Sequence, residues 1–286
     1  MSRFTLLLAL IAAPAFAQDK TDSAAERPWS VSLTGGITAV QAQADQPFGS
    51  LSVKRDIGDA YVRGAITYVG SGDARGLVIP ADSWIGTLGA GGSFGDLSLD
   101  GYVNFGRRSF EPARLRTQAG TAVNLDRSGG LFGIGATLTY DIAAGDRLFV
   151  SPFVGVDYNS IDFSVAVIGP GGNVINALDD KADGVTGTGG VAITHLFAGD
   201  GGSISLSGAL STASNIAAVG QLGQRTGSAL PRFVQNGNDA DSWGEVAGTI
   251  SFNVSQSVAI DLSVIQTIGF AFGDTTAGSA TLRFAF

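Results

Sequence analysis

Apolar and polar residues alternate along this chain with a period of two, and that pattern constrains the fold more than any other feature. Between residues 97 and 105, Leu97, Leu99 and Val103 fall on one parity, whereas Asp100 and Asn104 fall on the other. Successive side chains of a β-strand point to opposite sides, so this period indicates strands with one apolar and one polar face. About twelve such segments are found, at 29–39, 48–55, 60–69, 84–93, 97–106, 131–140, 147–158, 186–197, 203–211, 243–253, 258–267 and 278–286. The sequence therefore predicts an all-β fold.

The connections between these segments alternate between long and short. The short ones lie at 56–59, 94–96, 141–146, 198–202 and 254–257, and the long ones at 40–47, 70–83, 107–130, 159–185, 212–242 and 268–277. Outer-membrane barrels show this sorting, with short periplasmic turns and long extracellular loops, and their tilted strands span the bilayer in about 9–11 residues. A soluble sandwich has no physical reason to sort its connections by length. We therefore predict a closed antiparallel transmembrane β-barrel of about 12 strands, with both chain ends on the periplasmic side.

Composition excludes several other classes of protein. The 286 residues include no cysteine, one histidine and 42 glycines, and the formal net charge is −8. Without cysteine there is no disulfide framework, no thiolate metal site and no cysteine nucleophile. A negative chain is a poor partner for nucleic acid. Beyond the N-terminus no apolar run reaches the roughly 18–20 residues that a membrane helix needs, so strands are expected to cross the bilayer.

The N-terminus has the pattern of a targeting segment. Residues 1–17 combine an early Arg3, an apolar stretch and a small-residue ending, which is typical of a secretory signal peptide. We predict cleavage before Gln18, a short polar periplasmic tail at 18–28 and a single barrel domain at 29–286. This organisation implies export to the outer membrane of a Gram-negative bacterium.

Aromatic residues gather near the ends of the predicted strands. Amphipathic rings are enriched at the two membrane–water interfaces of such barrels, where they form girdles. The predicted interfacial girdle comprises Trp29, Tyr68, Trp84, Tyr140, Tyr158 and Trp243. Ordinary core aromatics would instead lie in the middle of strands.

The predicted inward face carries mostly serine, threonine, alanine and glycine. The charges expected on it are few: Arg63, Asp100, Glu245, Asp261 and Arg283. A barrel of twelve strands is wider than one that its own side chains just fill. Small residues would leave the lumen partly empty, and the sequence leaves open whether water or a folded-in segment occupies it.

The final segment, Gly278 to Phe286, alternates and ends in phenylalanine. It resembles the C-terminal strand of bacterial outer-membrane barrels, and the matching residues are Leu282, Phe284 and Phe286. This resemblance implies recognition by the barrel-assembly machinery during insertion. Together with the segment 148–158, the whole region 29–286 looks like an autotransporter β-domain. Only the residues 18–28 precede the first predicted strand, so the fold and the membrane are expected to carry over and passenger secretion is not.

The predicted loop 107–130 is basic in an otherwise acidic protein. Its arginines are Arg107, Arg108, Arg114, Arg116 and Arg127. Guanidinium groups suit phosphates and carboxylates. The loop is therefore a candidate for contacts with lipopolysaccharide phosphates or for an anion-selective constriction, although a solvated basic loop is the simpler explanation of the pattern.

No catalytic or cofactor site is predicted, and the chain is not expected to be an enzyme. The single histidine, His195, comes just before a short turn and shares its parity with Val191 and Ile193, so we interpret it as an interfacial residue. Acidic groups at 179–183 and 236–241 could offer oxygen ligands to calcium, but they lack a complete calcium-loop spacing and suit turns as well. The glycines at 89–92 and 187–190 lack the strand-to-helix context of a nucleotide loop.

The expected function is that of a passive pore for small solutes or of an envelope structural protein, in contact with outer-membrane lipid and lipopolysaccharide. An adhesin acting through the predicted loops 159–185 and 212–242 is the alternative. An outer-membrane hydrolase is a third hypothesis, which the position of His195 opposes.

Overall fold

The computed structural model describes residues 27–40, 45–70, 81–110, 113–116, 122–216, 218, 240–270 and 274–286. Its strands are β1 (Trp29–Val40), β2 (Gln46–Ile57), β3 (Ala60–Val69), β4 (Ala81–Phe94), β5 (Leu97–Phe110), β6 (Ala113–Arg116), β7 (Ala122–Tyr140), β8 (Ile142–Ala143), β9 (Leu148–Ile168), β10 (Val174–Leu196), β11 (Gly202–Ala213), β12 (Asp241–Ser255), β13 (Val258–Ile268) and β14 (Thr275–Ala285). The predicted signal peptide and almost all of the predicted tail lie outside the described residues.

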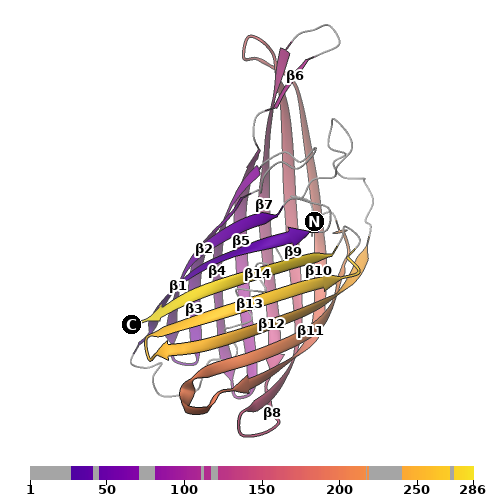
Figure 1. The fold of residues 1–286 in the computed structure, drawn as a ribbon. Helices are drawn as coiled ribbons and strands as arrows, with labels where there is room; N and C mark the ends of the chain where they lie inside the picture. Colours follow the sequence, from indigo (N-terminus) through magenta and orange to yellow (C-terminus); the bar gives the residue numbers. More distant parts are fainter. Residues whose placement is uncertain are drawn as a thin grey trace.

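Twelve of these strands form one closed antiparallel barrel, as predicted (Figure 1). Each barrel strand pairs with the next one along the chain, and β1 pairs with β14 from Ser30↔Ala285 to Val40↔Thr275, which removes both sheet edges. The short strands β6 and β8 are additions that pair with β7 and β9 respectively. In the part of the chain that the structure describes, no helix is long and apolar enough to cross a membrane.

Two of the short connections are two-residue turns with glycine first. Gly58 and Gly95 have φ angles of 62° and 68° and are followed by Asp59 and Asp96. Glycine at the first central position is what a type II′ turn requires, and this turn matches the twist of antiparallel strands. Sequence chemistry therefore fixes these hairpins locally. We call this end of the barrel the turn end and the opposite end the loop end.

Both ends of the described barrel lie at the turn end. The backbone N–H of Trp29 donates to the Phe286 carbonyl at 3.1 Å, and the N–H of Phe286 donates to the Trp29 carbonyl at 2.9 Å. The first and last strands thus close the barrel where its short turns are.

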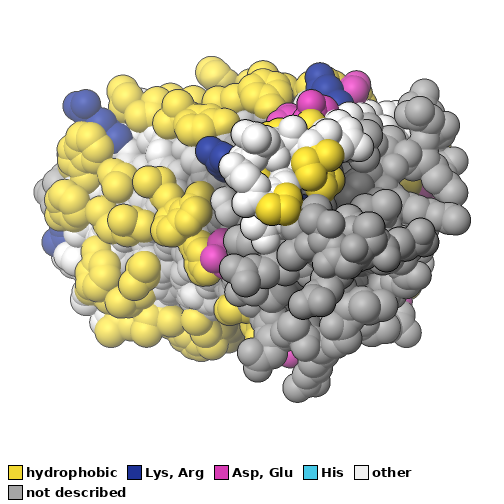
Figure 2. All heavy atoms as spheres, turned by 90° about the horizontal axis from the view of Figure 1, so that it is seen from above, with side chains coloured by type: hydrophobic (Ala, Val, Ile, Leu, Met, Phe, Trp, Pro, Cys, Tyr) yellow, Lys and Arg dark blue, Asp and Glu magenta, His cyan; other side chains and the backbone are white. Residues whose placement is uncertain are grey.

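The outer wall is apolar. Seen from above, hydrophobic side chains gather over the outside of the strands (Figure 2). Leu206 is 61 % exposed, Ile66 is 59 % exposed and Val154 is 58 % exposed, and each lies on the outward parity of its strand. So much exposed apolar surface is unfavourable in water, but it is what contact with lipid requires.

The strands at the loop end are longer than predicted. The expected loop at 159–185 is mostly strand, since β9 continues to Ile168, β10 begins at Val174, and the two pair from Val174↔Ile168 downward. The expected loop at 107–130 is likewise shortened by β5, β6 and β7. In Figure 1 these strands stand above the rest of the barrel. Along the extension of β9 the period of two continues in the opposite sense, since Ile161 and Val165 are buried on the inward side and Asp162 is exposed on the outward side. A polar outer face over an apolar inner one is what an antiparallel sheet in contact with water shows.

Candidate functional site

The lumen is the candidate functional site, because the inward faces of the strands carry nearly all of the buried polar side chains. The residues predicted to carry the inward charges do lie on the inward parity: Arg63, Asp100, Glu245, Asp261 and Arg283. The large polar side chains among the inward residues come mainly from β2, β3, β5 and β9. The wall formed by β10 to β14 and β1 is lined mostly by small residues.

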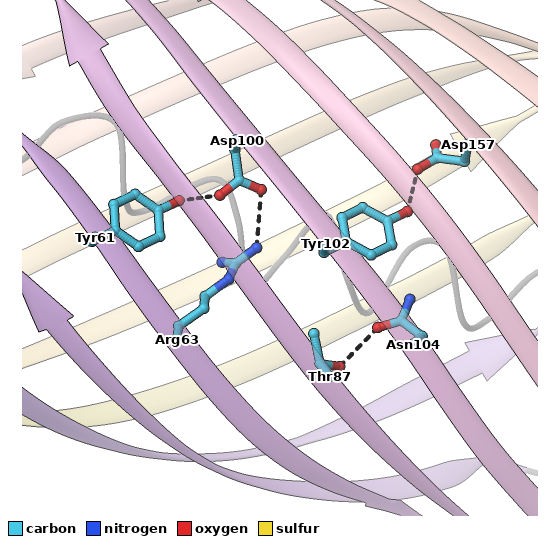
Figure 3. A network of polar contacts seen from close by, with 7 residues as sticks. All are labelled: Tyr61, Arg63, Thr87, Asp100, Tyr102, Asn104 and Asp157. Carbon is cyan, nitrogen blue, oxygen red and sulfur yellow. Dashed lines mark hydrogen bonds and ion pairs between the residues drawn. The ribbon is translucent and has the colours of Figure 1, made fainter.

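An ion pair and a tyrosine form the first part of a polar network in the lumen (Figure 3). Arg63 Nη2 on β3 lies 3.0 Å from Asp100 Oδ1 on β5, and the two side chains are 9 % and 3 % exposed. The Tyr61 hydroxyl donates to the second carboxylate oxygen of Asp100. Asp100 therefore satisfies both of its oxygens with partners from β3, reached across the intervening strand β4.

The second part of the network continues along β5. The Tyr102 hydroxyl donates to Asp157 on β9, and the Thr87 hydroxyl donates to Asn104 Oδ1 at 2.8 Å (Figure 3). Asn104 is completely buried, with 0 % of its surface exposed. Side chains from β3, β4, β5 and β9 are thereby tied together on one side of the lumen.

Inward glycines make room for these large side chains. A Cβ atom on Gly89 would lie 2.7 Å from Arg63 Nε, one on Gly91 would lie 2.8 Å from the Tyr61 ring, and one on Gly135 would lie 2.7 Å from Tyr102 Cζ. Each glycine is the direct register partner of the residue whose large side chain crosses over it from the neighbouring strand. The glycines at 89–92 are strand glycines, as interpreted from the sequence. The spacing of two residues between Gly89 and Gly91 is the sequence feature from which large side chains crossing this strand could have been predicted.

The opposite wall is lined by hydroxyl groups that bond across strands. Such cross-strand pairs stabilise a sheet without exposing a charge. The pairs are Thr34–Thr281 at 2.8 Å, Thr188–Ser211 at 2.9 Å, Thr194–Ser205 at 3.0 Å and Thr249–Ser263 at 3.0 Å. The lumen is therefore asymmetric, with most of the bulky polar groups on one side and mostly small hydroxyl-bearing residues on the other, where Trp243, Glu245 and the Arg283–Asp261 pair are the large exceptions among the described residues.

Two further pairs of opposite inward charges lie outside the first network. Arg283 Nη2 lies 3.3 Å from Asp261 Oδ1, and Lys54 Nζ lies 2.9 Å from Asp56 Oδ1. Together with the Arg63–Asp100 pair, they make three ion pairs in which each charge is compensated locally. Local compensation weakens the preference of a lumen for ions of one sign.

Trp243 differs from its predicted position in the girdle. It is 5 % exposed and lies on the inward face of β12, where its indole N–H donates to Glu245 Oε1 at 2.7 Å. Its ring packs edge-on against Phe270 with the ring centroids 4.9 Å apart. The parity of Trp243 is that of Glu245, so the alternation itself assigns it to the lumen side. The sequence interpretation considered only its place near a strand end.

The other five girdle residues lie on the outward face. Trp29 and Tyr140 are 39 % and 48 % exposed near the turn end, and Trp84 is 56 % exposed at the loop end. Tyr68 and Tyr158 are partly exposed on the same outward parity. His195 is also outward and exposed, and its ring lies 6.5 Å from that of Phe197, which stays consistent with an interfacial residue.

The arginines predicted to act together are separated by the strand geometry. Since β5 extends to Phe110, Arg107 is exposed on the outer wall and Arg108 is 4 % exposed on the inner one. Arg108 Cζ and Arg127 Cζ lie 5.2 Å and 5.7 Å from the centroid of the Phe110 ring. Burial lowers the pKa of the Arg127 guanidinium, which nevertheless stays charged because an arginine does not lose its proton in proteins. Arg114 and Arg116 lie on β6, and their side chains are outside the described part.

The remaining candidates occupy separate places. Asp179 and Asp183 are exposed on β10 and therefore lie on a strand, not in the loop that the calcium hypothesis assumed. Residues 236–239 lie outside the described part, and the described residues hold no group of three metal-ligating side chains. Phe284 and Phe286 are exposed on the outer wall at 43 % and 62 %, with Leu282 on the same face.

Comparison with known proteins agrees with this architecture. Residues 60–264 match the family described as the autotransporter beta-domain, which is more than half of the chain. The structure is similar to the translocator domain of the autotransporter NalP from Neisseria meningitidis, with a TM-score of 0.66, 12 % identity, and 100 % and 96 % of the two chains covered. It is also similar to the β-domain of the Bordetella autotransporter BrkA, with a TM-score of 0.60, 12 % identity, and 90 % and 98 % covered. LpxR from Salmonella typhimurium matches with a TM-score of 0.53 and 13 % identity, covering 90 % of this chain and all of that one. No curated protein matches the sequence.

Proposed function

Since this chain belongs to the autotransporter β-domain family and forms an outer-membrane barrel of the translocator type, we propose that it acts as a passive pore for small polar solutes. The observation that carries the proposal is the hydroxyl-lined wall from β10 around to β1. Small hydroxyls leave space in a twelve-stranded barrel, and they offer hydrogen bonds to a solute without holding it strongly.

The bulky side of the lumen supports a channel that runs off the barrel axis. Tyr61, Arg63 and Tyr102 project from β3 and β5 and are held by Asp100 and Asp157. Their hydrogen bonds fix them against the wall, so solutes would pass along the opposite, hydroxyl-bearing side. Because the three ion pairs are internally compensated, we expect weak selectivity between cations and anions.

Conductance of the purified protein in planar bilayers tests this function. The natural chain has no cysteine, so Ser207→Cys on the inward face of β11 can be labelled with a charged thiol reagent. Leu206→Cys is the matched control, because Leu206 is the preceding residue and is 61 % exposed on the lipid side. We expect the reagent to lower the conductance of the Ser207→Cys pore and to leave the Leu206→Cys pore unchanged.

The proposal fails if a barrel that shows heat-modifiable migration on a detergent gel carries no current. It also fails if Ser207→Cys does not react from the aqueous phase. The proposed export route is tested separately, since N-terminal sequencing of the membrane-inserted protein should begin at Gln18 if the predicted signal peptide is removed.

Binding at the cell surface is a second candidate function, favoured by the hairpin of β9 and β10. The two strands remain paired from Asn159↔Gly184 up to Ile168↔Val174, beyond the apolar part of the outer wall. Ile175, Asn176 and Ala177 are exposed there. A rigid, exposed hairpin of this kind could present side chains to a partner. Loss of cell adhesion on shortening the hairpin, with unchanged conductance, would support this function.

A further inference from the structure

The apolar surface of the outer wall ends at a defined boundary at the loop end. On β4, Leu88 is followed on the outward parity by Gly86, Trp84 and Asp82, and on β5, Phe105 is followed by Arg107. Below this boundary Leu88 and Phe105 are 57 % and 55 % exposed. The side chains at the boundary therefore lie where the acyl chains of a lipid give way to its headgroup.

Three side chains at this boundary form an ordered surface. The Tyr68 and Trp84 rings are 5.1 Å apart between centroids and tilted by 51°. The Tyr68 hydroxyl donates to Asp82 Oδ1 at 2.7 Å, which fixes the exposed carboxylate beside the rings. The aromatic pair and the carboxylate come from two neighbouring strands, β3 and β4.

Arg107 completes this surface from the next strand. It is paired directly with Trp84, and both side chains are exposed on the outward face. On its other side Arg107 is paired with Gly130, which has no side chain and over which the Asp162 carboxylate of β9 lies. Arg107 thus lies in register between Trp84 on one side and Gly130, which the Asp162 carboxylate covers, on the other.

We infer that Tyr68, Asp82, Trp84 and Arg107 bind the phosphorylated sugar headgroup of an outer-leaflet glycolipid, that is, lipopolysaccharide. A guanidinium pairs with phosphate through two parallel hydrogen bonds. An exposed indole offers a flat apolar face to a sugar ring, and the Asp82 carboxylate, held by Tyr68, accepts hydrogen bonds from sugar hydroxyls. Arg108 takes no part, because it lies on the lumen side of the same strand.

The inference rests on the part of the proposed function that puts the loop end at the cell surface, and it does not depend on the pore being open. The turn end carries a partial counterpart, in which Arg55 Cζ lies 5.1 Å from the centroid of the Trp29 ring. Arg55 faces outward and is exposed as Arg107 is. It supplies a matched control at the opposite interface.

Binding of purified lipid A to the full-length barrel in detergent, measured by native mass spectrometry and by thermophoresis, tests the site. We expect Arg107→Gln to weaken the binding of bisphosphorylated lipid A about tenfold, the scale of one charge-assisted hydrogen-bonded pair. Trp84→Ala and Asp82→Asn should weaken it less, whereas Arg55→Gln should leave it unchanged. Phosphatidylglycerol binding should be unaffected by Trp84→Ala, because that lipid has no sugar ring to stack.

Equal losses for Arg107→Gln and Arg55→Gln would overturn the inference, as would no loss for Arg107→Gln. Equal loss of phosphatidylglycerol and lipid A binding would show that any anionic lipid suffices and would overturn it too. Heat-modifiable migration verifies that each variant is folded. The orientation is checked independently with Asn173→Cys in the turn between β9 and β10, which should react with an impermeant reagent on intact cells.

Discussion

At the scale of single residues, the inward glycines determine whether the polar network of the lumen can form. Gly91 lies beneath the Tyr61 ring, and a Cβ there would also lie 2.7 Å from the Leu99 carbonyl oxygen. A backbone atom cannot move aside as the end of a flexible side chain can. We therefore expect Gly91→Ala to lower the free energy of unfolding by about 1–3 kcal/mol, the usual cost of overpacking.

Gly208 is the control for this prediction, because a Cβ at that outward position would meet nothing within 4 Å. Gly208→Ala should change stability by less than about 0.5 kcal/mol. Urea titration of both variants in lipid vesicles, followed by tryptophan fluorescence, measures the difference. Equal effects would mean that the crowding around Gly91 does not limit the network.

At the scale of elements, the projecting hairpin is separable from the barrel. Ser164 and Asp179 are directly paired in the β9–β10 ladder. Replacing residues 165–178 by Asn-Gly would join them through a two-residue turn suited to antiparallel strands. β7 would lose its pairs to β9 from Asn124 to Arg127. We expect folding and conductance to persist, because the removed segment lies beyond the lipid-facing wall. Failure to fold would show that the projection is part of the barrel's stability.

The last strand carries a second prediction at this scale, on assembly. Phe286 is 62 % exposed on the outer wall and contributes no core packing, so its side chain is available to the assembly machinery that the sequence resemblance implies. We expect Phe286→Ser to reduce the amount of barrel inserted in cells severalfold and to leave refolding of the purified chain into detergent unchanged. Phe252→Ser is the control, since Phe252 is 42 % exposed on β12 near the same end. Equal losses in cells would attribute the effect to lipid contact alone.

At the scale of the whole molecule, the two faces of the wall meet different solvents. Leu206 and Ser207 are successive residues near the middle of β11, one 61 % exposed on the outside and the other on the inward face. A lysine facing lipid at mid-depth costs about 2–4 kcal/mol, whereas substitutions facing the lumen of such barrels mainly tune selectivity. Leu206→Lys should therefore be clearly less stable than Ser207→Lys when unfolding is measured in lipid vesicles. In a water-exposed barrel the order would be absent or reversed.

The sequence by itself determined the wall of this protein. The closed barrel could be predicted from the alternation over twelve segments, from the turns at Gly58 and Gly95, and from the sorting of short and long connections. The alternation also predicted for most residues whether the side chain faces the lipid or the lumen. These features are local, since each strand must present an apolar face to lipid whatever its neighbours are. The inward positions of Arg63, Asp100 and Glu245 follow from the same parity.

The tertiary structure decided what meets inside the lumen and how far the strands continue. The Arg63–Asp100 pair joins β3 and β5 across β4, so it depends on the register of three strands. The hydropathy pattern of a single strand contains no information about that register. On the extension of β9 the alternation is reversed, with Ile161 and Val165 buried on the inward side and Asp162 exposed on the outward side, because water and not lipid meets the outer face there. The extension of β5 to Phe110 likewise places Arg107 and Arg108 on opposite faces of the wall. The lipid-facing sense of the alternation ends where the lipid ends, and beyond that point the pairing of strands in space shows that the sheet continues.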